Sequence, residues 1–79
     1  MKKVIAVPLN DIQRPSIWSA VQCTHYVNQF RTGTPVAPIV LTHETPGMPH
    51  KYRIKDGAHR LHAARIVGLR KINAIILET

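Results

Sequence analysis

Short apolar runs with β-branched residues recur four times along the chain, and each predicts a β-strand. The runs cover residues 3–7, 38–42, 51–56 and 71–78. We expect Pro8 to end the first strand, because proline cannot donate a hydrogen bond to a strand ladder. In the third run, apolar Tyr52 and Ile54 alternate with two cations, a pattern typical of a half-buried strand.

Two longer segments have helical spacing. From Ser16 to Gly33, apolar residues recur among polar ones, with Ser16 as the expected N-cap and Gly33 as the expected C-cap. The second segment starts near Gly57 and stops near Gly68. Between the second and third runs, residues 44–49 contain two prolines and a glycine, which predicts a loop that joins two strands of a hairpin.

The predicted order of elements is therefore β-α-β-β-α-β. We expect residues 1–79 to form one small α+β domain, in which two helices pack on a mixed sheet of about four strands. A chain of this length buries a thin core. With 5% aromatic residues, that core must consist mainly of isoleucine, valine, leucine and alanine.

Composition narrows the class of protein. A single cysteine, Cys23, excludes a disulfide within the chain and a cysteine-based zinc site, and it favours a reducing, cytoplasmic setting. The N-terminus begins with two lysines like a signal peptide, but Pro8 interrupts its short apolar run. No apolar run approaches the length of a membrane span, so we expect no membrane partner.

The net charge of +7 bears on the class of binding partner. Eleven Lys and Arg residues stand against four Asp and Glu residues. This balance favours a polyanionic partner such as a nucleotide or a nucleic acid. Small basic proteins also carry charge for solubility alone, so the charge indicates a class of partner without identifying it.

The junction of the third strand and the second helix concentrates the candidate chemistry. Gly57 permits a tight exit from the strand, and the amides of Ala58, His59 and Arg60 are the unpaired donors of a helix start. Such donors lie at the positive end of the helix dipole, where phosphate binds. On a helical wheel of about 100° per residue, Arg60 lies in line with the apolar stripe. We expect it to reach past the helix end toward an anion.

The alternative interpretation of this turn is structural. Asp56 would cap the helix, Gly57 would merely permit the turn, and the cations would form a solvated face. The combination of the glycine, the free amides, His59 and the inward Arg60 favours an anion site instead. Arg65, on the polar side of the wheel, is expected to be dispensable for both folding and binding.

At this turn the sequence resembles a known superfamily. The segment "DGAHRLHAARIVGLRKINAII" is similar to the core motif of the ParB/sulfiredoxin-like superfamily: a strand, Gly-x-(His or Arg)-Arg, a helix with paired alanines, Gly-Leu and a final apolar strand. Upstream, "VIAVPLNDIQRP" resembles the opening strand of that superfamily, and "GTPVAPIVL" resembles its "G-x-x-x-PIVV" strand. The resemblance covers nearly the whole chain in the right order.

The resemblance implies a nucleotide-phosphate site formed by Gly57, Ala58, His59 and Arg60. In this superfamily, ParB proteins bind and hydrolyse CTP and sulfiredoxins bind ATP, and the relatives include free serine kinases and ParB-like nucleases. CTP or ATP, with Mg²⁺, is therefore the expected cofactor. Ala58 stands where sulfiredoxins have their catalytic cysteine, which argues against sulfinic-acid repair. Asp56 would bind magnesium or act as a base.

Other side chains have weaker claims. Arg53 and Lys55 share a strand face and would extend a basic patch toward DNA or toward the rest of a nucleotide; a solvated face is an equal alternative. For Trp18 and Tyr26, we expect core packing rather than base stacking. Asp11 is interpreted as a turn residue rather than a second catalytic acid.

Metal and thiol chemistry are not predicted. His59 and His62 lack a third ligand at a recognisable spacing, so no metal site is expected. Cys23 and His25 point in different directions on a helix, which favours a structural, half-buried cysteine over a nucleophile.

Three hypotheses about function remain open. The first is a nucleotide-phosphate-binding domain, with NTP hydrolysis or phosphoryl transfer left undecided. The second is a DNA-associated module with non-specific binding and, as a variant, nuclease activity. The third is an interaction domain that keeps the fold and has lost the site. Four acidic residues are few for a two-metal nuclease centre, which weighs against nuclease chemistry.

Overall fold

The computed structural model describes residues 3–14 and 20–77. The elements follow in the order β1 (Val4–Pro8), a 3-10 turn η1 (Leu9–Asp11), α1 (Ala20–Thr32), β2 (Ile39–His43), β3 (Tyr52–Asp56), α2 (Ala58–Val67) and β4 (Lys71–Leu77). The predicted order of strands and helices is confirmed. The predicted N-cap Ser16, and Trp18 with it, lie outside the described residues.

The four strands form one mixed sheet with the order β1-β4-β2-β3. β1 pairs antiparallel with β4, β4 pairs parallel with β2, and β2 pairs antiparallel with β3. The strand β1 includes Pro8, opposite Lys71, one residue further than its sequence predicts. Proline is tolerated here because β1 is an edge strand and Pro8 is its last residue.

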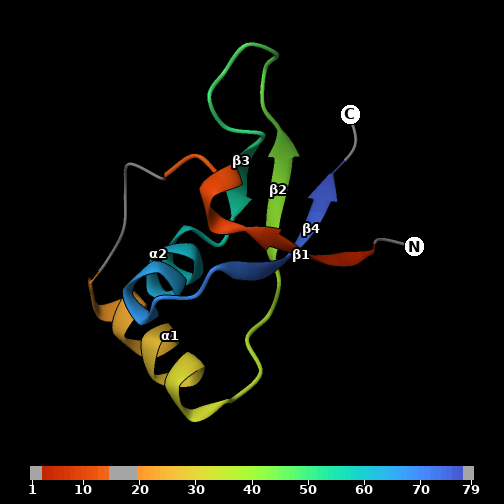
Figure 1. The fold of residues 1–79 in the computed structure, drawn as a ribbon. Helices are drawn as coiled ribbons and strands as arrows, with labels where there is room; N and C mark the ends of the chain where they lie inside the picture. The colour runs from red at the N-terminus through yellow and green to blue at the C-terminus, as the bar shows by residue number, and fades with distance from the viewer. Residues whose placement is uncertain (1–2, 15–19, 78–79) are drawn as a thin grey trace.

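Both helices lie on the same side of the molecule, with α2 between the sheet and α1 (Figure 1). Leu61, Ala63 and Ala64 of α2 are completely buried. The two alanines are small enough to let neighbouring backbones approach α2 closely. The core cluster on the sheet consists of Val7, Leu9, Ile12, Ile39, Leu41, Leu61, Ala64, Ile72 and Ala74. Cys23 and Val27 of α1 are also buried.

Glycines define both ends of α2, as the sequence predicts. Gly57 and Gly68 take left-handed conformations, with φ of 105° and 89°. At the C-terminal end, the amides of Gly68 and Leu69 both donate to the carbonyl of Ala64, which is the pattern of a glycine-terminated helix. The helix is therefore fixed at both ends, and its N-terminal end is held at the end of β3.

Candidate functional site

Gly57 is the residue on which the β3–α2 turn depends. It follows Asp56, the last residue of β3, and is the N-cap of α2. A Cβ at this position would lie 2.6 Å from Cγ2 of Ile39 and have a left-handed φ. Both the contact and the conformation exclude larger residues. The absence of a side chain brings the start of α2 against β2.

The first amides of α2 are available to a ligand. The first hydrogen bond of the helix runs from the amide of Leu61 to the carbonyl of Gly57. The amides of the three residues between them therefore lack partners within the helix. No side chain caps the helix, so the alternative in which Asp56 is the cap is wrong. Asp56 turns its carboxylate to Arg60 instead, at 3.3 Å.

Arg60 connects three parts of the chain. Its side chain is 13% exposed, as its place in the apolar stripe predicts. Nη1 donates to the carbonyls of Ala37 and Pro38, at 3.0 and 2.9 Å, just before β2. Nη2 lies 3.3 Å from Asp56 and would be 3.1 Å from a Cβ on Gly57.

This geometry corrects the expectation that Arg60 reaches freely past the helix end. The carbonyls of Ala37 and Pro38 precede β2 and need hydrogen-bond donors. Nη1 donates to both of them. One edge of the guanidinium is thus structural. The other edge, at Nη2, lies over Gly57 and faces the start of α2.

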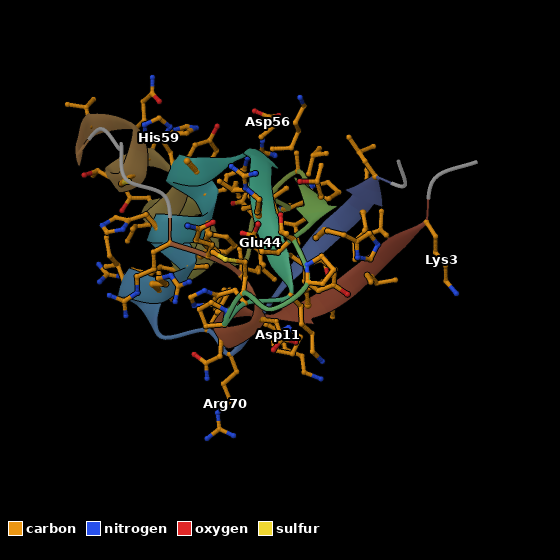
Figure 2. All side chains as sticks on the ribbon, turned by 90° about the horizontal axis from the view of Figure 1, so that it is seen from above. Lys3, Asp11, Glu44, Asp56, His59 and Arg70 are labelled. Carbon is orange, nitrogen blue, oxygen red and sulfur yellow. The ribbon has the colours of Figure 1, made fainter. Side chains whose placement is uncertain are left out.

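A cleft of about 380 Å³ lies at this turn. It is lined by Gln22, Tyr26, Ile54, Lys55, Asp56, Gly57, Ala58, His59 and Arg60. We call it the α2 cleft. It brings together all the predicted phosphate-binding residues and the predicted acid. Figure 2 shows Asp56 and His59 at the same end of the molecule, away from Lys3 and Arg70.

The two cations of β3 have separate environments. Lys55 lines the α2 cleft. Arg53 points to Glu44, with its Nε 3.7 Å from a carboxylate whose side chain is 5% exposed. Arg53 is not among the lining residues of the cleft, and its charge is already paired. Of the two cations, Lys55 therefore belongs to the α2 cleft and Arg53 does not. A contact of Arg53 with nucleic acid stays a prediction.

The sequence raised base stacking at Tyr26 without connecting it to the β3–α2 turn, and it did not single out Gln22. Gln22 and Tyr26 contribute to the wall of the α2 cleft, and the Arg60 guanidinium lies 6.0 Å from the centre of the Tyr26 ring. Tyr26 is only half-buried, so the expectation of core packing is met in part. The position of Tyr26 on one side of α1 could be read from the sequence. Its contact with Arg60 could not, because α2, which carries Arg60, is distant in sequence.

Asp11 lies at the opposite end of β3. Its carbonyl accepts from the amide of Lys51, and its carboxylate is 3.9 Å from that residue's ammonium group. Asp56 is the last residue of β3, five residues after Lys51. Figure 2 shows Asp11 far from Asp56. Asp11 belongs to the turn η1 and is no second acid of the α2 cleft.

Cys23 is structural. It is 2% exposed, and its Sγ lies 3.7 Å from the carbonyl of His59. Burial raises the pKa of the Cys23 thiol, which disfavours the reactive thiolate. His25 contacts the ring of Tyr26 edge-on. The cysteine is more deeply buried than the sequence indicated, and no thiol chemistry follows.

The expectation for Arg65 is wrong. Its Nη2 donates to the carbonyls of Leu9 and Ile12, each at 3.2 Å, so the side chain ties α2 to η1. The helical wheel placed it correctly on the polar side. The two carbonyls that accept from Arg65 belong to residues near the N-terminus. A helical wheel of α2 alone does not show such partners.

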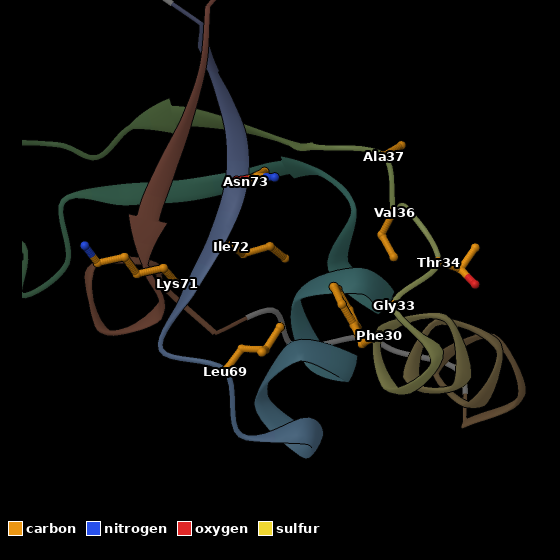
Figure 3. A pocket seen from close by; sticks show the side chains of 9 residues that line it. All are labelled: Phe30, Gly33, Thr34, Val36, Ala37, Leu69, Lys71, Ile72 and Asn73. Carbon is orange, nitrogen blue, oxygen red and sulfur yellow. The ribbon is translucent and has the colours of Figure 1, made fainter.

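A second cavity, of about 230 Å³, lies between the end of α1 and β4 (Figure 3). Most of its lining is apolar or small, and it includes none of the residues predicted for the site. Across residues 3–14 and 20–77, no three His, Cys, Asp or Glu side chains gather as metal ligands. In the same residues, no helix is long and apolar enough to span a bilayer.

In the sequence comparisons, no family model matches the chain, and no curated protein matches it. Structural comparison is informative. Sulfiredoxin from Arabidopsis thaliana superposes with a TM-score of 0.78 at 23% identity, over 98% of this chain and 86% of the sulfiredoxin chain. The chain has the ParB/sulfiredoxin-like fold. The resemblance predicted from the β3–α2 motif is confirmed at the level of the fold.

Two further proteins of this fold were solved with nucleotides. C-terminally truncated ParB from Caulobacter crescentus, complexed with CTP-gamma-S, matches with a TM-score of 0.80 at 20% identity. A free serine kinase in complex with AMP matches with a TM-score of 0.73 at 22% identity. Each match covers 98% of this chain, but only 45% of the ParB chain and 31% of the kinase chain.

Proposed function

We propose that the α2 cleft binds the phosphate chain of a nucleotide. The observation that carries this proposal is the start of α2, whose first residues line the α2 cleft and whose first amides have no capping side chain. Bare amides at a helix start, in the positive field of the helix dipole, are suited to phosphate oxygens.

Side chains of the cleft add to these amides. Nη2 of Arg60 lies over Gly57, and Nη1 holds the guanidinium in place through two carbonyls. A fixed guanidinium binds phosphate with little loss of conformational entropy. Lys55 and His59 supply further donors on the same cleft. Tyr26, half-exposed beside them, offers a ring face for the nucleotide base.

The fold supports a nucleotide as the class of ligand. The ParB neighbour was solved with CTP-gamma-S and the free serine kinase with AMP. We infer a nucleoside triphosphate, CTP or ATP, as the ligand of this chain. Asp56 is the only carboxylate among the lining residues, and it would hold Mg²⁺ together with the phosphates.

Turnover is a further step of the proposal. In hydrolysis or phosphoryl transfer, Asp56 would accept a proton from the attacking group. Nuclease chemistry is disfavoured, because the three acids in the described residues lie apart. Asp11, in η1, lies near the start of β3, Asp56 is its last residue, and Glu44 pairs with Arg53.

Calorimetric titration with CTP, ATP and GTP, with and without Mg²⁺, tests this function. The variant Lys55→Gln removes one charge from the α2 cleft, and Lys3→Gln removes one from the exposed start of the chain. We expect the first variant to weaken nucleotide binding by about 1 kcal/mol, or roughly fivefold, and the second to leave it unchanged. Equal losses in both variants would show that only net charge matters and would contradict the proposal.

A further inference from the structure

A third cavity, of about 520 Å³, lies at the other end of α2. Its walls come from the end of β1, η1 and the α2–β4 turn. It is lined by Pro8, Leu9, Asn10, Arg14, Arg65, Leu69, Arg70 and Lys71. Four of these eight residues are cations and none is an acid, so we call it the cationic cavity. The α2 cleft is separated from it by the length of a ten-residue helix, about 15 Å.

No acidic side chain among the described residues compensates this charge. The described residues contain three acids, and each already has a cationic partner outside the cavity. Asp11, Glu44 and Asp56 pair with Lys51, Arg53 and Arg60, respectively. Within residues 3–14 and 20–77, no ion pair satisfies the cations of the cavity.

Arg65 forms the inner part of the cavity. Its Nη2 is held by the carbonyls of Leu9 and Ile12, while its Nε is buried without a hydrogen-bond partner among the described residues. Burial lowers the pKa of Arg65, and the charge of Arg14 lowers it further. The protein therefore fixes a charged group where it is disfavoured by both desolvation and a like charge. A bound anion would offset both effects.

The outer cations stand on a rigid backbone. The carbonyl of Arg70 accepts from the amide of Leu9 at 2.9 Å, and Lys71 is paired with Pro8 in the sheet. Their side chains are exposed. Figure 2 shows Arg70 extending outward from the body of the protein, and Figure 3 shows Lys71 extending away from Phe30. The cavity thus has a fixed inner arginine and cations that reach outward.

We propose that the cationic cavity binds the phosphodiester backbone of a nucleic acid. Guanidinium groups match phosphate geometry, and cations that extend from a half-buried Arg65 to a projecting Arg70 fit a chain of phosphates better than one small anion. Contacts to phosphates position a protein on a nucleic acid but carry no sequence information. Binding is therefore independent of sequence and steeply dependent on salt.

This proposal replaces the location predicted from the sequence for a DNA contact. Arg53 pairs with Glu44, and Lys55 lines the α2 cleft. The charge that has no acidic partner among the described residues lies instead in the cationic cavity. Binding here is also separable from nucleotide binding, because the two sites share no lining residue.

Fluorescence anisotropy with a short labelled duplex, and with its single strand, tests the proposal at about 50 and 200 mM salt. The double variant Arg70→Gln/Lys71→Gln removes two exposed charges from the cavity. The matched control, Lys3→Gln/Arg31→Gln, removes two exposed charges elsewhere. We expect the first variant to bind either nucleic acid about tenfold more weakly and to reduce the salt slope by about 2. We expect the control to stay within about twofold of wild type.

Amide NMR shifts locate the contact in the same titration. The proposal requires shifts at Leu69 to Lys71 on addition of the oligonucleotide. It is overturned if both double variants lose affinity equally, if neither nucleic acid binds wild type at low salt, or if the shifts are confined to Gly57 to Arg60. Thermal melts of both double variants verify that they fold.

Discussion

Gly57 and Ile39 approach so closely that a Cβ on the glycine would stand 2.6 Å from Cγ2 of the isoleucine. This contact sets the start of α2 against β2, and with it the position of the α2 cleft. Because Ile39 is completely buried, it has no space to move away. The stability of the fold and the geometry of the cleft therefore depend on the same missing side chain.

Gly57→Ala is expected to destabilise the protein. The left-handed conformation costs a non-glycine residue about 1–2 kcal/mol, and the overlap with Ile39 adds about 1–3 kcal/mol. Gly68→Ala is the control, since Gly68 also has a positive φ but an added Cβ meets nothing within 4 Å. Urea denaturation measures both variants. Equal losses of stability would mean that the contact with Ile39 is unimportant.

Arg60→Ala is expected to lower both stability and nucleotide affinity. Loss of the guanidinium leaves the carbonyls of Ala37 and Pro38 without their donor, at a cost of about 1–3 kcal/mol. These hydrogen bonds give Arg60 a structural role beside the anion binding expected from the sequence.

Arg60→Lys separates the two roles of that side chain. It retains the charge and one donor but loses the fork that reaches the carbonyls and Gly57 at once. We expect the lysine variant to fold well enough for titration and to bind nucleotide about tenfold or more weakly. Calorimetry and thermal melts give the two readouts. Wild-type affinity in the lysine variant would make Arg60 purely structural.

Asp56→Asn is expected to raise nucleotide affinity without Mg²⁺ and to lower it with Mg²⁺. Without the metal, loss of the carboxylate removes repulsion toward phosphate and frees Nη2 of Arg60, so affinity rises roughly fivefold, about 1 kcal/mol. With Mg²⁺, the variant lacks its carboxylate ligand and affinity falls. Asp11→Asn, at the other end of β3, is the control. A variant that responds identically in both conditions would exclude Asp56 as a metal ligand.

The Cys23 thiol gives a prediction about pH. Burial raises its pKa in the folded state, so the folded protein retains this proton when the unfolded chain releases it, near pH 8.5. Stability from this group is present below that pH and is lost as the pH rises through the folded pKa. Thermal melts between neutral and alkaline pH should show a steeper decline for wild type than for Cys23→Ala. Parallel declines would contradict the assignment.

The fold was largely predictable because its signals are local. The alternation of Tyr52 and Ile54 with cations predicted a half-buried strand, and glycines at both ends of α2 predicted its limits. The strand order, with β1 beside β4, depends on pairings distant in sequence and was not predicted. Pro8 within β1 shows the same limit, since its tolerance depends on β1 being an edge strand.

For the candidate site, too, local features could be predicted from the sequence and distant contacts could not. The inward position of Arg60 could be predicted with a helical wheel, because it depends only on the spacing of residues within α2. The carbonyl partners of Arg60 and Arg65 lie 22 to 56 residues away, and those contacts determine what each arginine does. The partner of Arg53 was hidden for a similar reason, since Glu44 reaches it only across the β2–β3 hairpin.

The central claim is that phosphate binds the bare amides at the start of α2. Its most direct test is an amide NMR titration of wild type with a nucleoside triphosphate, pyrophosphate and the matching nucleoside. We expect the first two ligands to shift the amides of Ala58, His59 and Arg60 downfield, and the nucleoside alone to leave them unchanged. Unmoved amides at these three positions with a saturating triphosphate would contradict the claim.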